Sequence, residues 1–194
     1  MLLKTIIADV RSNVDHTRRS GLGYWARVFG KLLFTPTVQV VVMFRISTAL
    51  YKFPPTRPFA FILRSMAVVW GGTELHPAAK IGPGLCLIHS QKVLIADGVT
   101  IGKDARISHG VSIGGDTGRG AAGIVGFPVL GDGVTIALDS IVLGPVTIGD
   151  GAVISAQSLV VRDVPAGAVV AGSPARVVRM AEPAEALEPS KETE

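Results

Sequence analysis

Aliphatic residues recur every six positions through most of the chain, and this period constrains the fold more than any other feature. The first series is Leu75, Ile81, Leu87, Ile95, Ile101, Ile107 and Ile113, and the second is Leu130, Ile136, Val142, Ile148, Ile154 and Val160. A six-residue period fits neither an amphipathic helix nor an alternating strand. It predicts a parallel β-helix, in which each unit forms one flat side of a prism and then turns a corner.

Two departures interrupt the period. Leu87 and Ile95 are eight residues apart, so two extra residues are expected to bulge near His89. Ile113 and Leu130 are seventeen apart, which places an eleven-residue insertion within 114–129. This glycine-rich insertion is expected to leave the prism as an arm loop. Loops carried by a rigid scaffold are frequent sites of function.

The rest of the chain divides into a helical segment and a tail. Residues 1–72 are expected to be α-helical, over about 9–16, 24–34, 37–51 and 59–70. Glycines at 71 and 72 end the last helix. The β-helix then covers 73–178, and the acidic tail, 179–194, is expected to be disordered.

Charge is distributed unevenly between these parts. Residues 1–70 carry a net charge of +8, residues 71–180 are neutral, and residues 181–194 carry −4. The basic helical segment is interpreted first as a solvated surface and second as a peripheral contact with an anionic membrane. We expect no nucleic-acid partner. One cysteine, Cys86, and the lack of a signal-like apolar run favour a soluble, cytoplasmic protein.

Several motifs resemble serine O-acetyltransferases, which are hexapeptide-repeat acyltransferases with a left-handed β-helix. The similar stretches are Glu74-Leu75-His76-Pro77, Leu87-Ile88-His89, Val111–Gly115, Val142–Gly151 and Gly172–Val177. The resemblance spans about residues 70–178. It implies an acetyl-CoA-dependent enzyme in which an acceptor hydroxyl attacks the thioester directly, with no metal.

The resemblance also implies catalytic roles. His89 stands where the family has its general base, and Glu74 where an acidic residue orients that base. An imidazole suits this task because it titrates near neutral pH. His109 is the rival base: it also lies two residues after an aliphatic position and should stack one coil along, about 5 Å away. His76 is interpreted as a structural corner residue.

Acetyl-CoA in the family lies in a groove between neighbouring β-helices of a trimer. The matching positions here are Gly114, Gly115, Leu138, Ala156 and Arg176, and Leu138 replaces a small residue. We therefore expect a homotrimer or a dimer of trimers.

The acceptor-binding residues depart from the family pattern. An Arg-His-Pro that grips the carboxylate of serine is replaced by Gly126-Phe127-Pro128, and an aspartate that holds its amine is replaced by Ile88. Burying an unpaired charge costs several kcal/mol, so the acceptor is expected to be a small hydroxyl compound such as a sugar or a modified amino acid. A serine O-acetyltransferase of cysteine biosynthesis and a non-catalytic structural subunit are the alternatives. A zinc carbonic anhydrase is disfavoured because no close pair of histidines has the required spacing.

Overall fold

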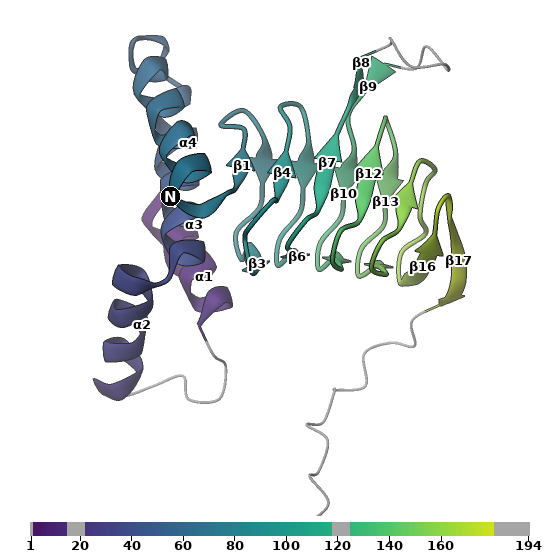
Figure 1. The fold of residues 1–194 in the computed structure, drawn as a ribbon, viewed down its shortest axis with the longest axis horizontal. Helices are drawn as coiled ribbons and strands as arrows, with labels where there is room; N and C mark the ends of the chain where they lie inside the picture. Colours follow the sequence, from purple (N-terminus) through teal and green to yellow (C-terminus); the bar gives the residue numbers. More distant parts are fainter. Residues whose placement is uncertain (1, 15–21, 118–124, 181–194) are drawn as a thin grey trace, which may run out of the picture.

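The chain folds into a helical segment followed by a three-sided parallel β-helix (Figure 1). The structure is a computed structural model that describes residues 2–14, 22–117 and 125–180. The predicted fold class is confirmed. The predicted disordered tail, 179–194, lies outside the described residues except at 179 and 180, where the prediction was wrong because these two residues belong to strand β17 (Ala175–Met180).

Four α-helices precede the β-helix. They are α1 (Leu2–Asn13), α2 (Leu22–Phe34), α3 (Pro36–Tyr51) and α4 (Arg57–Gly71), with a 3-10 turn, η1 (Pro54–Thr56), before α4. Three of these helices were predicted within a few residues. Helix α1 begins much earlier than the predicted start near residue 9. Helix α4 ends at Gly71 and is capped by Gly72 in the left-handed conformation (φ 62°).

Each side of the prism is one parallel sheet, and sheet C also has an antiparallel last strand, β17. Sheet A contains β1 (Glu74–Leu75), β4 (Leu94–Ile95), β7 (Ser112–Gly114), β12 (Ile141–Leu143) and β15 (Leu159–Val160). Sheet B contains β2 (Lys80–Ile81), β5 (Thr100–Ile101), β10 (Val129–Leu130) and β13 (Thr147–Ile148). Sheet C contains β3 (Cys86–Ile88), β6 (Arg106–Ser108), β11 (Thr135–Ile136), β14 (Val153–Ile154), β16 (Ala168–Gly172) and β17 (Ala175–Met180).

The hexapeptide positions form the core of this prism. Ile95, Ile107, Ile113, Ile136, Ile148 and Ile154 are fully buried, and equivalent residues stack in register, as in the pair Ile107 and Ile136. The series also continues further than predicted. Val164 pairs with Ile148, and Val170 pairs with Ile154. The spacing of four residues between Val160 and Val164 hides this continuation from a six-residue pattern.

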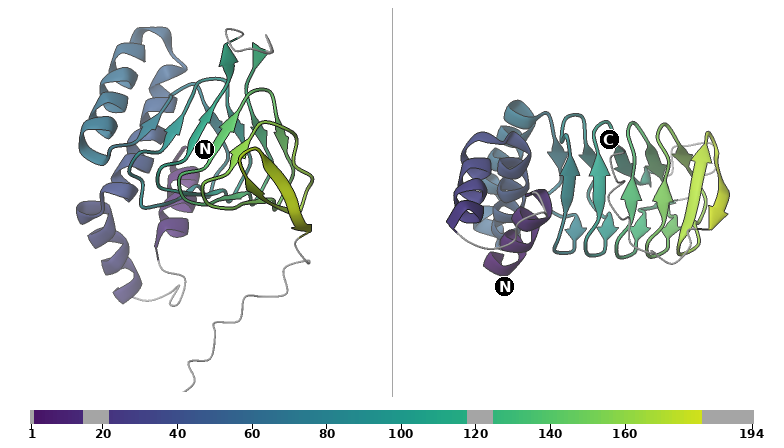
Figure 2. Two further views of the ribbon diagram at one scale, coloured as in Figure 1. Left: turned by 45° about the vertical axis from the view of Figure 1, so that its right-hand side comes forward. Right: turned by 90° about the horizontal axis from the view of Figure 1, so that it is seen from below.

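Two antiparallel strand pairs depart from the parallel coils of the prism. The arm leaves the prism as an antiparallel pair, β8 (Asp116–Thr117) and β9 (Val125–Gly126), and its residues 118–124 lie outside the described residues. At the far end, β17 pairs antiparallel with β16, as the views in Figure 2 show.

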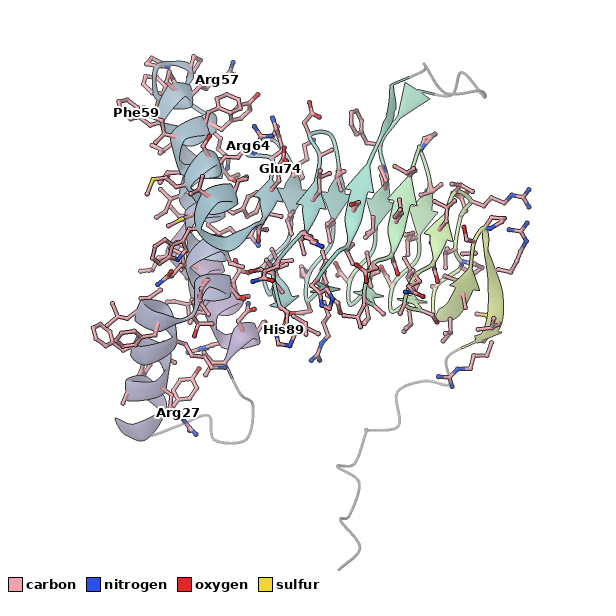
Figure 3. The ribbon with its side chains drawn as sticks, in the orientation of Figure 1. Arg27, Arg57, Phe59, Arg64, Glu74 and His89 are labelled. Atoms are coloured by element: carbon pink, nitrogen blue, oxygen red, sulfur yellow. The ribbon has the colours of Figure 1, made fainter. Side chains whose placement is uncertain are left out.

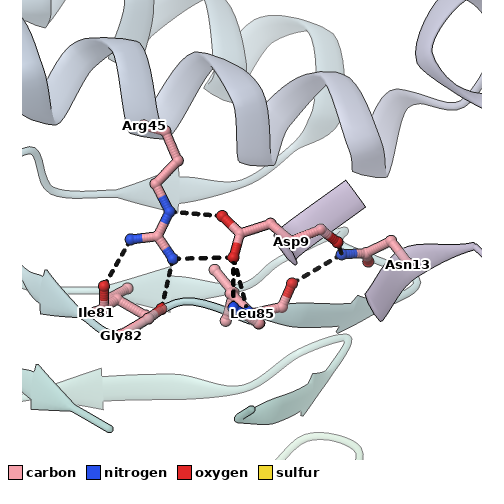
Figure 4. Close-up of polar contacts among 7 residues, drawn as sticks. Asp9, Asn13, Arg45, Ile81, Gly82 and Leu85 are labelled. Carbon is pink, nitrogen blue, oxygen red and sulfur yellow. Dashed lines mark hydrogen bonds and ion pairs between the residues drawn. The ribbon is translucent and has the colours of Figure 1, made fainter. Parts of the chain in front are cut away.

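The helical segment lies against the first coil through two ion pairs. At one corner Arg64 of α4 pairs with Glu74 of β1 (Figure 3). Deeper inside, the carboxylate of Asp9 in α1 accepts bonds from Arg45 of α3, at 2.6 and 3.2 Å (Figure 4). Both Asp9 and Arg45 are buried.

This inner pair also bonds the backbone of the first coil. Arg45 donates to the carbonyls of Ile81 and Gly82, each at 2.6 Å. The amides of Gly84 and Leu85 donate to Asp9 Oδ1 at 2.8 and 3.0 Å. A buried charge pair is tolerated when its remaining polar groups are bonded in this way. The pair therefore sets the position of the helices against the β-helix.

Candidate functional site

The bulge that carries His89 is located at the corner between sheets C and A. The register between the first two coils holds through the pair of Ile88 and Ser108 and is regained only in the next side of the prism, at Leu94 with Ser112. Two residues in the bulge, His89 (φ 55°) and Lys92 (φ 58°), adopt the left-handed conformation. Few non-glycine residues adopt this conformation, and they cluster at functional sites.

The bulge changes which residue stacks on His109. The amide of Gly110 donates to the carbonyl of Gln91 at 3.0 Å, so Gln91 occupies the position above His109. His89 is displaced outward and exposed. The prediction that His109 stacks directly beneath His89 was therefore wrong in register. The two rings still meet edge to face, with centroids 6.4 Å apart.

A cavity of about 430 Å³ opens where this corner meets the helices. Its walls come from the start of α3, the end of α4, the bulge and the next coil, namely Pro36, Thr37, Trp70, Gly71, His89, Ser90, Gln91 and His109. Thr37 Oγ1 donates to Ser90 Oγ at 3.2 Å, and Thr73 Oγ1 donates to the carbonyl of Ser90 at 2.6 Å. These bonds fix the bulge against the helical segment.

The ring of His89 is available to a ligand. Within the described residues it makes no hydrogen bond or ion pair, and its ring contact is with His109. An exposed imidazole at the mouth of a cavity can accept a proton from a bound hydroxyl.

Glu74 has another partner in this chain. Its carboxylate pairs with Arg64, and no hydrogen bond joins it to His89 within the described residues. Figure 3 shows Glu74 beside Arg64, with His89 below them on the bulge. The orienting role of Glu74 therefore stays a prediction from the resemblance.

His76 lies in an aromatic cluster away from the cavity. Its ring contacts those of Tyr51 and Phe61 at centroid distances of 6.0 and 5.9 Å. Its Nδ1 accepts from the amide of Ala78 at 3.2 Å. Burial lowers the pKa of His76 below the usual value, with Asp97 opposing the shift. This agrees with its interpretation as a structural residue.

The positions expected to line an acetyl-CoA groove fall in three places. Leu138 and Ala156 follow His109 along the same corner, linked by bonds from Asp139 N to His109 O and from Gln157 N to Leu138 O. Gly114 and Gly115 lie at the other end of sheet A, where the arm begins. Arg176 lies in the terminal hairpin and is exposed. One chain alone therefore does not bring all five together.

Ile88 and Phe127, which are expected to replace charged serine-binding residues of the family, are partly exposed. Ile88 immediately precedes His89. Phe127 lies at the base of the arm, where its ring covers Gly98 and Gly115 so closely that a Cβ at either glycine would overlap it. Both positions present apolar surface.

Cys86 is buried close to the helical segment. Burial raises the pKa of its thiol, with Arg106 and Lys31 opposing the shift. A thiol with a raised pKa is a poor nucleophile. An acyl-cysteine route therefore has no support in this geometry.

Sequence reasoning did not identify the helical side of the cavity. Trp70 and Thr37 line it from α4 and α3. The available signals were Thr35-Pro36, which starts a helix, and the Trp70-Gly71-Gly72 break, but neither indicates which coil the helix ends approach.

The chain is similar to serine acetyltransferases in sequence and in structure. It is 36% identical over 150 residues to the serine acetyltransferase of Helicobacter pylori (strain ATCC 700392 / 26695), which covers 76% of this chain and 84% of that protein. Among solved structures, the Neisseria gonorrhoeae serine acetyltransferase in complex with serine has a TM-score of 0.78 and 30% identity, covering 92% of this chain and 69% of that one.

A serine acetyltransferase in complex with coenzyme A, from Brucella abortus strain S19, has a TM-score of 0.79 and 27% identity, covering 93% of this chain and 68% of that one. No family model matches the chain. The similarity to the Helicobacter pylori protein extends over most of both chains, and the β-helix is shared with the solved structures. The chain therefore belongs to the serine acetyltransferase family.

Proposed function

We propose that this acetyl-CoA-dependent acyltransferase transfers an acetyl group to an alcohol, with His89 as the general base. The observation that carries the proposal is the position of His89. It lies in the bulge with a left-handed backbone conformation, at the mouth of the cavity between the helices and the β-helix. The hydroxyl of the acceptor donates its proton to the imidazole as its oxygen attacks the thioester carbonyl. The thiolate of CoA then takes up a proton and leaves.

Acetyl-CoA fits along the corner that runs from His109 past Leu138 to Ala156. A related structure contains coenzyme A, which supports this co-substrate. Leu138 is exposed over this corner and narrows it where the family has a small residue. Gly114 and Gly115 would complete the groove from a neighbouring prism of a homotrimer. Sheet A offers apolar side chains for such packing, including Leu94, Ile141 and Leu143.

The acceptor is proposed to be an alcohol other than free L-serine, on a sugar or a modified amino acid with masked charges. Ile88 and Phe127 place apolar surface where a zwitterion needs paired charges. L-Serine is the second candidate, because a relative with 30% identity was solved in complex with serine.

A thiol-release assay with acetyl-CoA tests both parts. The acceptor panel holds L-serine, homoserine, monosaccharides and nucleotide sugars. Release with a sugar and little with L-serine is expected. A kcat/KM for L-serine of about 10⁴ M⁻¹s⁻¹ or more, which is ordinary for an enzyme, would refute the acceptor assignment. No release with any alcohol would favour a non-catalytic subunit.

Two matched variants test the base. His89→Ala is expected to lower kcat by about two to four orders of magnitude and to leave acetyl-CoA binding unchanged. His109→Ala removes a ring from the same cavity and should have a milder effect. The reverse order would make His109 the base. Glu74→Gln should lower kcat if Glu74 orients His89, and should change only stability if its role is to pair with Arg64.

A further inference from the structure

An apolar groove of about 770 Å³ lies between α3 and α4. Its lining comes from one face of α4 and the first half of α3, namely Gln39, Met43, Pro58, Phe61, Ile62, Ser65, Met66, Val69 and Trp70. Among these described lining residues none carries a charge, and only Gln39 and Ser65 are polar. A concave apolar site of this size is typical of a pocket for a small molecule.

Gln39 fixes the end of the groove that is nearest to the cavity of the site. Its Nε2 donates to the carbonyl of Leu33 at 2.6 Å, and its Oε1 accepts from Trp70 Nε1 at 2.6 Å. The first of these bonds spans the bend between α2 and α3. No single described helix is both long and apolar enough to cross a bilayer, and Gly23–Phe34 and Pro36–Tyr51 reach that length and composition only as a pair bent by 80°. The indole of Trp70 is thus held beside α3.

Trp70 also lines the cavity that holds His89, so the groove and the cavity adjoin at its indole. Their linings differ. The cavity offers hydroxyl, amide and imidazole groups, including those of Thr37, Gln91 and His109, whereas the groove is apolar. A polar group in the groove would lose its hydrogen bonds with water, and an apolar chain gains free energy by leaving water there. Together the two hollows fit a molecule with a polar end and an apolar chain.

We propose that the groove binds an apolar chain carried by the acceptor alcohol. The inference rests on the proposed function, which places the reacting hydroxyl at His89, and it adds the class of acceptor: a sugar or a masked amino acid that bears an alkyl or acyl chain. The chain belongs to the acceptor because the donor, acetyl-CoA, carries only an acetyl group. From Pro58 to Trp70, α4 rises about 18 Å at about 1.5 Å per residue, which exceeds the length of an extended octyl chain.

The contribution of the chain follows from how far the groove encloses it. The groove is open along one side, since Ile62 and Met66 are 54% and 49% exposed. A methylene that is fully buried contributes about fourfold in affinity, and one that is half buried contributes about twofold. Four further methylenes in the groove should therefore strengthen binding about 16-fold.

Thiol release from acetyl-CoA tests this value with two pairs of acceptors that cover both classes. The first pair is butyl and octyl β-glucoside, and the second is the methyl esters of N-butanoyl- and N-octanoyl-L-serine. Each compound is used below its critical micelle concentration. Within a pair the longer acceptor should have the higher kcat/KM, by about 16-fold, and the gain should come through KM.

Two matched variants test whether the groove is responsible. Ile62→Glu places a charge in the groove, at a half-exposed side chain. The ratio of kcat/KM between the longer and the shorter acceptor should fall from about 16 to about 1–2. The control, Leu3→Glu, changes a side chain of the same size on α1, which is 69% exposed and outside the groove lining. The control should keep the ratio of the wild type.

Fluorescence quenching measures binding of the chain without turnover. Trp25 and Trp70 are the two tryptophans, so Trp25→Phe leaves Trp70 as the reporter. The probe is octyl glucoside with bromine on its alkyl chain, because bromine quenches an indole that it contacts. Quenching of Trp70 should saturate below the critical micelle concentration, and Ile62→Glu in the same background should abolish the saturable part.

The outcomes separate this inference from the proposed function. Equal kcat/KM for the longer and shorter acceptors, quenching that does not saturate, or an equal loss in Leu3→Glu would overturn the inference. Saturable quenching without acetylation of any alcohol would instead overturn the proposed function and keep the groove as a site for apolar chains. If light scattering shows that Ile62→Glu halves the mass of the wild type, and quenching does not saturate, a second copy of the chain covers the groove. Should Ile62→Glu fail to fold, the chain-length ratio and the quenching without this substitution decide.

Discussion

Replacing Arg45 by methionine should destabilise the attachment of the helices to the β-helix. The carboxylate of Asp9 is fully buried and accepts four N–H groups, two from Arg45 and one each from Gly84 and Leu85. Arg45→Met leaves that carboxylate with two weaker donors. It also removes the donors to two carbonyls, at Ile81 and Gly82. Removing one partner of a buried pair costs about 3–5 kcal/mol.

A second variant removes both charges of the buried pair. In Asp9→Asn with Arg45→Met the buried group is neutral, and the Asn oxygen can still accept from the amides of Gly84 and Leu85. The remaining cost is that of carbonyls left without donors, about 1–3 kcal/mol each when they are buried, and the carbonyl of Gly82 is only partly buried. The double variant should therefore be more stable than Arg45→Met alone.

Urea unfolding measures both values. Trp25 and Trp70, the two tryptophans, both lie in the helical segment. Their fluorescence therefore reports that segment, while far-UV circular dichroism reports the whole chain. With a slope of about 2.5 kcal/mol per M of urea, the fluorescence midpoint of Arg45→Met should fall by about 1–2 M. A fall of less than about 0.4 M, or a double variant less stable than the single, would refute the assigned role of the pair.

Three other changes follow from the site and its surroundings. The pKa of His76 is lower in the folded chain than in the unfolded chain, so its contribution to stability is complete above pH about 6.5, the unfolded value. This contribution is lost as the pH falls through the lower folded pKa. His76→Asn, whose side-chain oxygen can still accept from the amide of Ala78, should reduce this loss of stability at acid pH, as measured by thermal melts across pH. Gly98→Ala should lower the free energy of unfolding by about 1–2 kcal/mol because residue 98 has a φ of 76°, and by more because the new Cβ overlaps the Phe127 ring. Adding Phe127→Ala should recover only the part due to overlap, as measured by urea titration. Leu138→Ala should strengthen acetyl-CoA binding in calorimetry if this side chain narrows the groove, and unchanged affinity would place the groove elsewhere.

The repeat made the β-helix predictable, because a six-residue period encodes both the buried position and the corner. It also located the bulge at His89 and the arm. It did not encode how the extra residues are distributed within the bulge. The hydrogen bond from Gly110 to Gln91 decides that distribution, and it depends on two coils at once.

Contacts between distant segments were the part that could not be predicted. Asp9 shares a helix face with Asn13, whose amide donates to Leu85 O, but the sequence contains no periodic signal for either contact. The same holds for Glu74, whose pairing with Arg64 depends on the angle at which α4 meets β1. Local patterns predict elements, and the packing of those elements decides which charges meet.

The bonds made by Asp9, Asn13 and Arg45 have a consequence for assembly. Strands β2 and β3 are the last members of sheets B and C at the helical end, and such terminal strands present backbone groups that another chain can pair with. The three side chains already bond to that backbone at 81–87, where a further coil would otherwise attach. At the other end, the antiparallel strand β17 covers β16 in a register that a parallel coil cannot extend. A chain that lost α1 and α3 would therefore expose a growing end, and such chains are expected to stack into fibres.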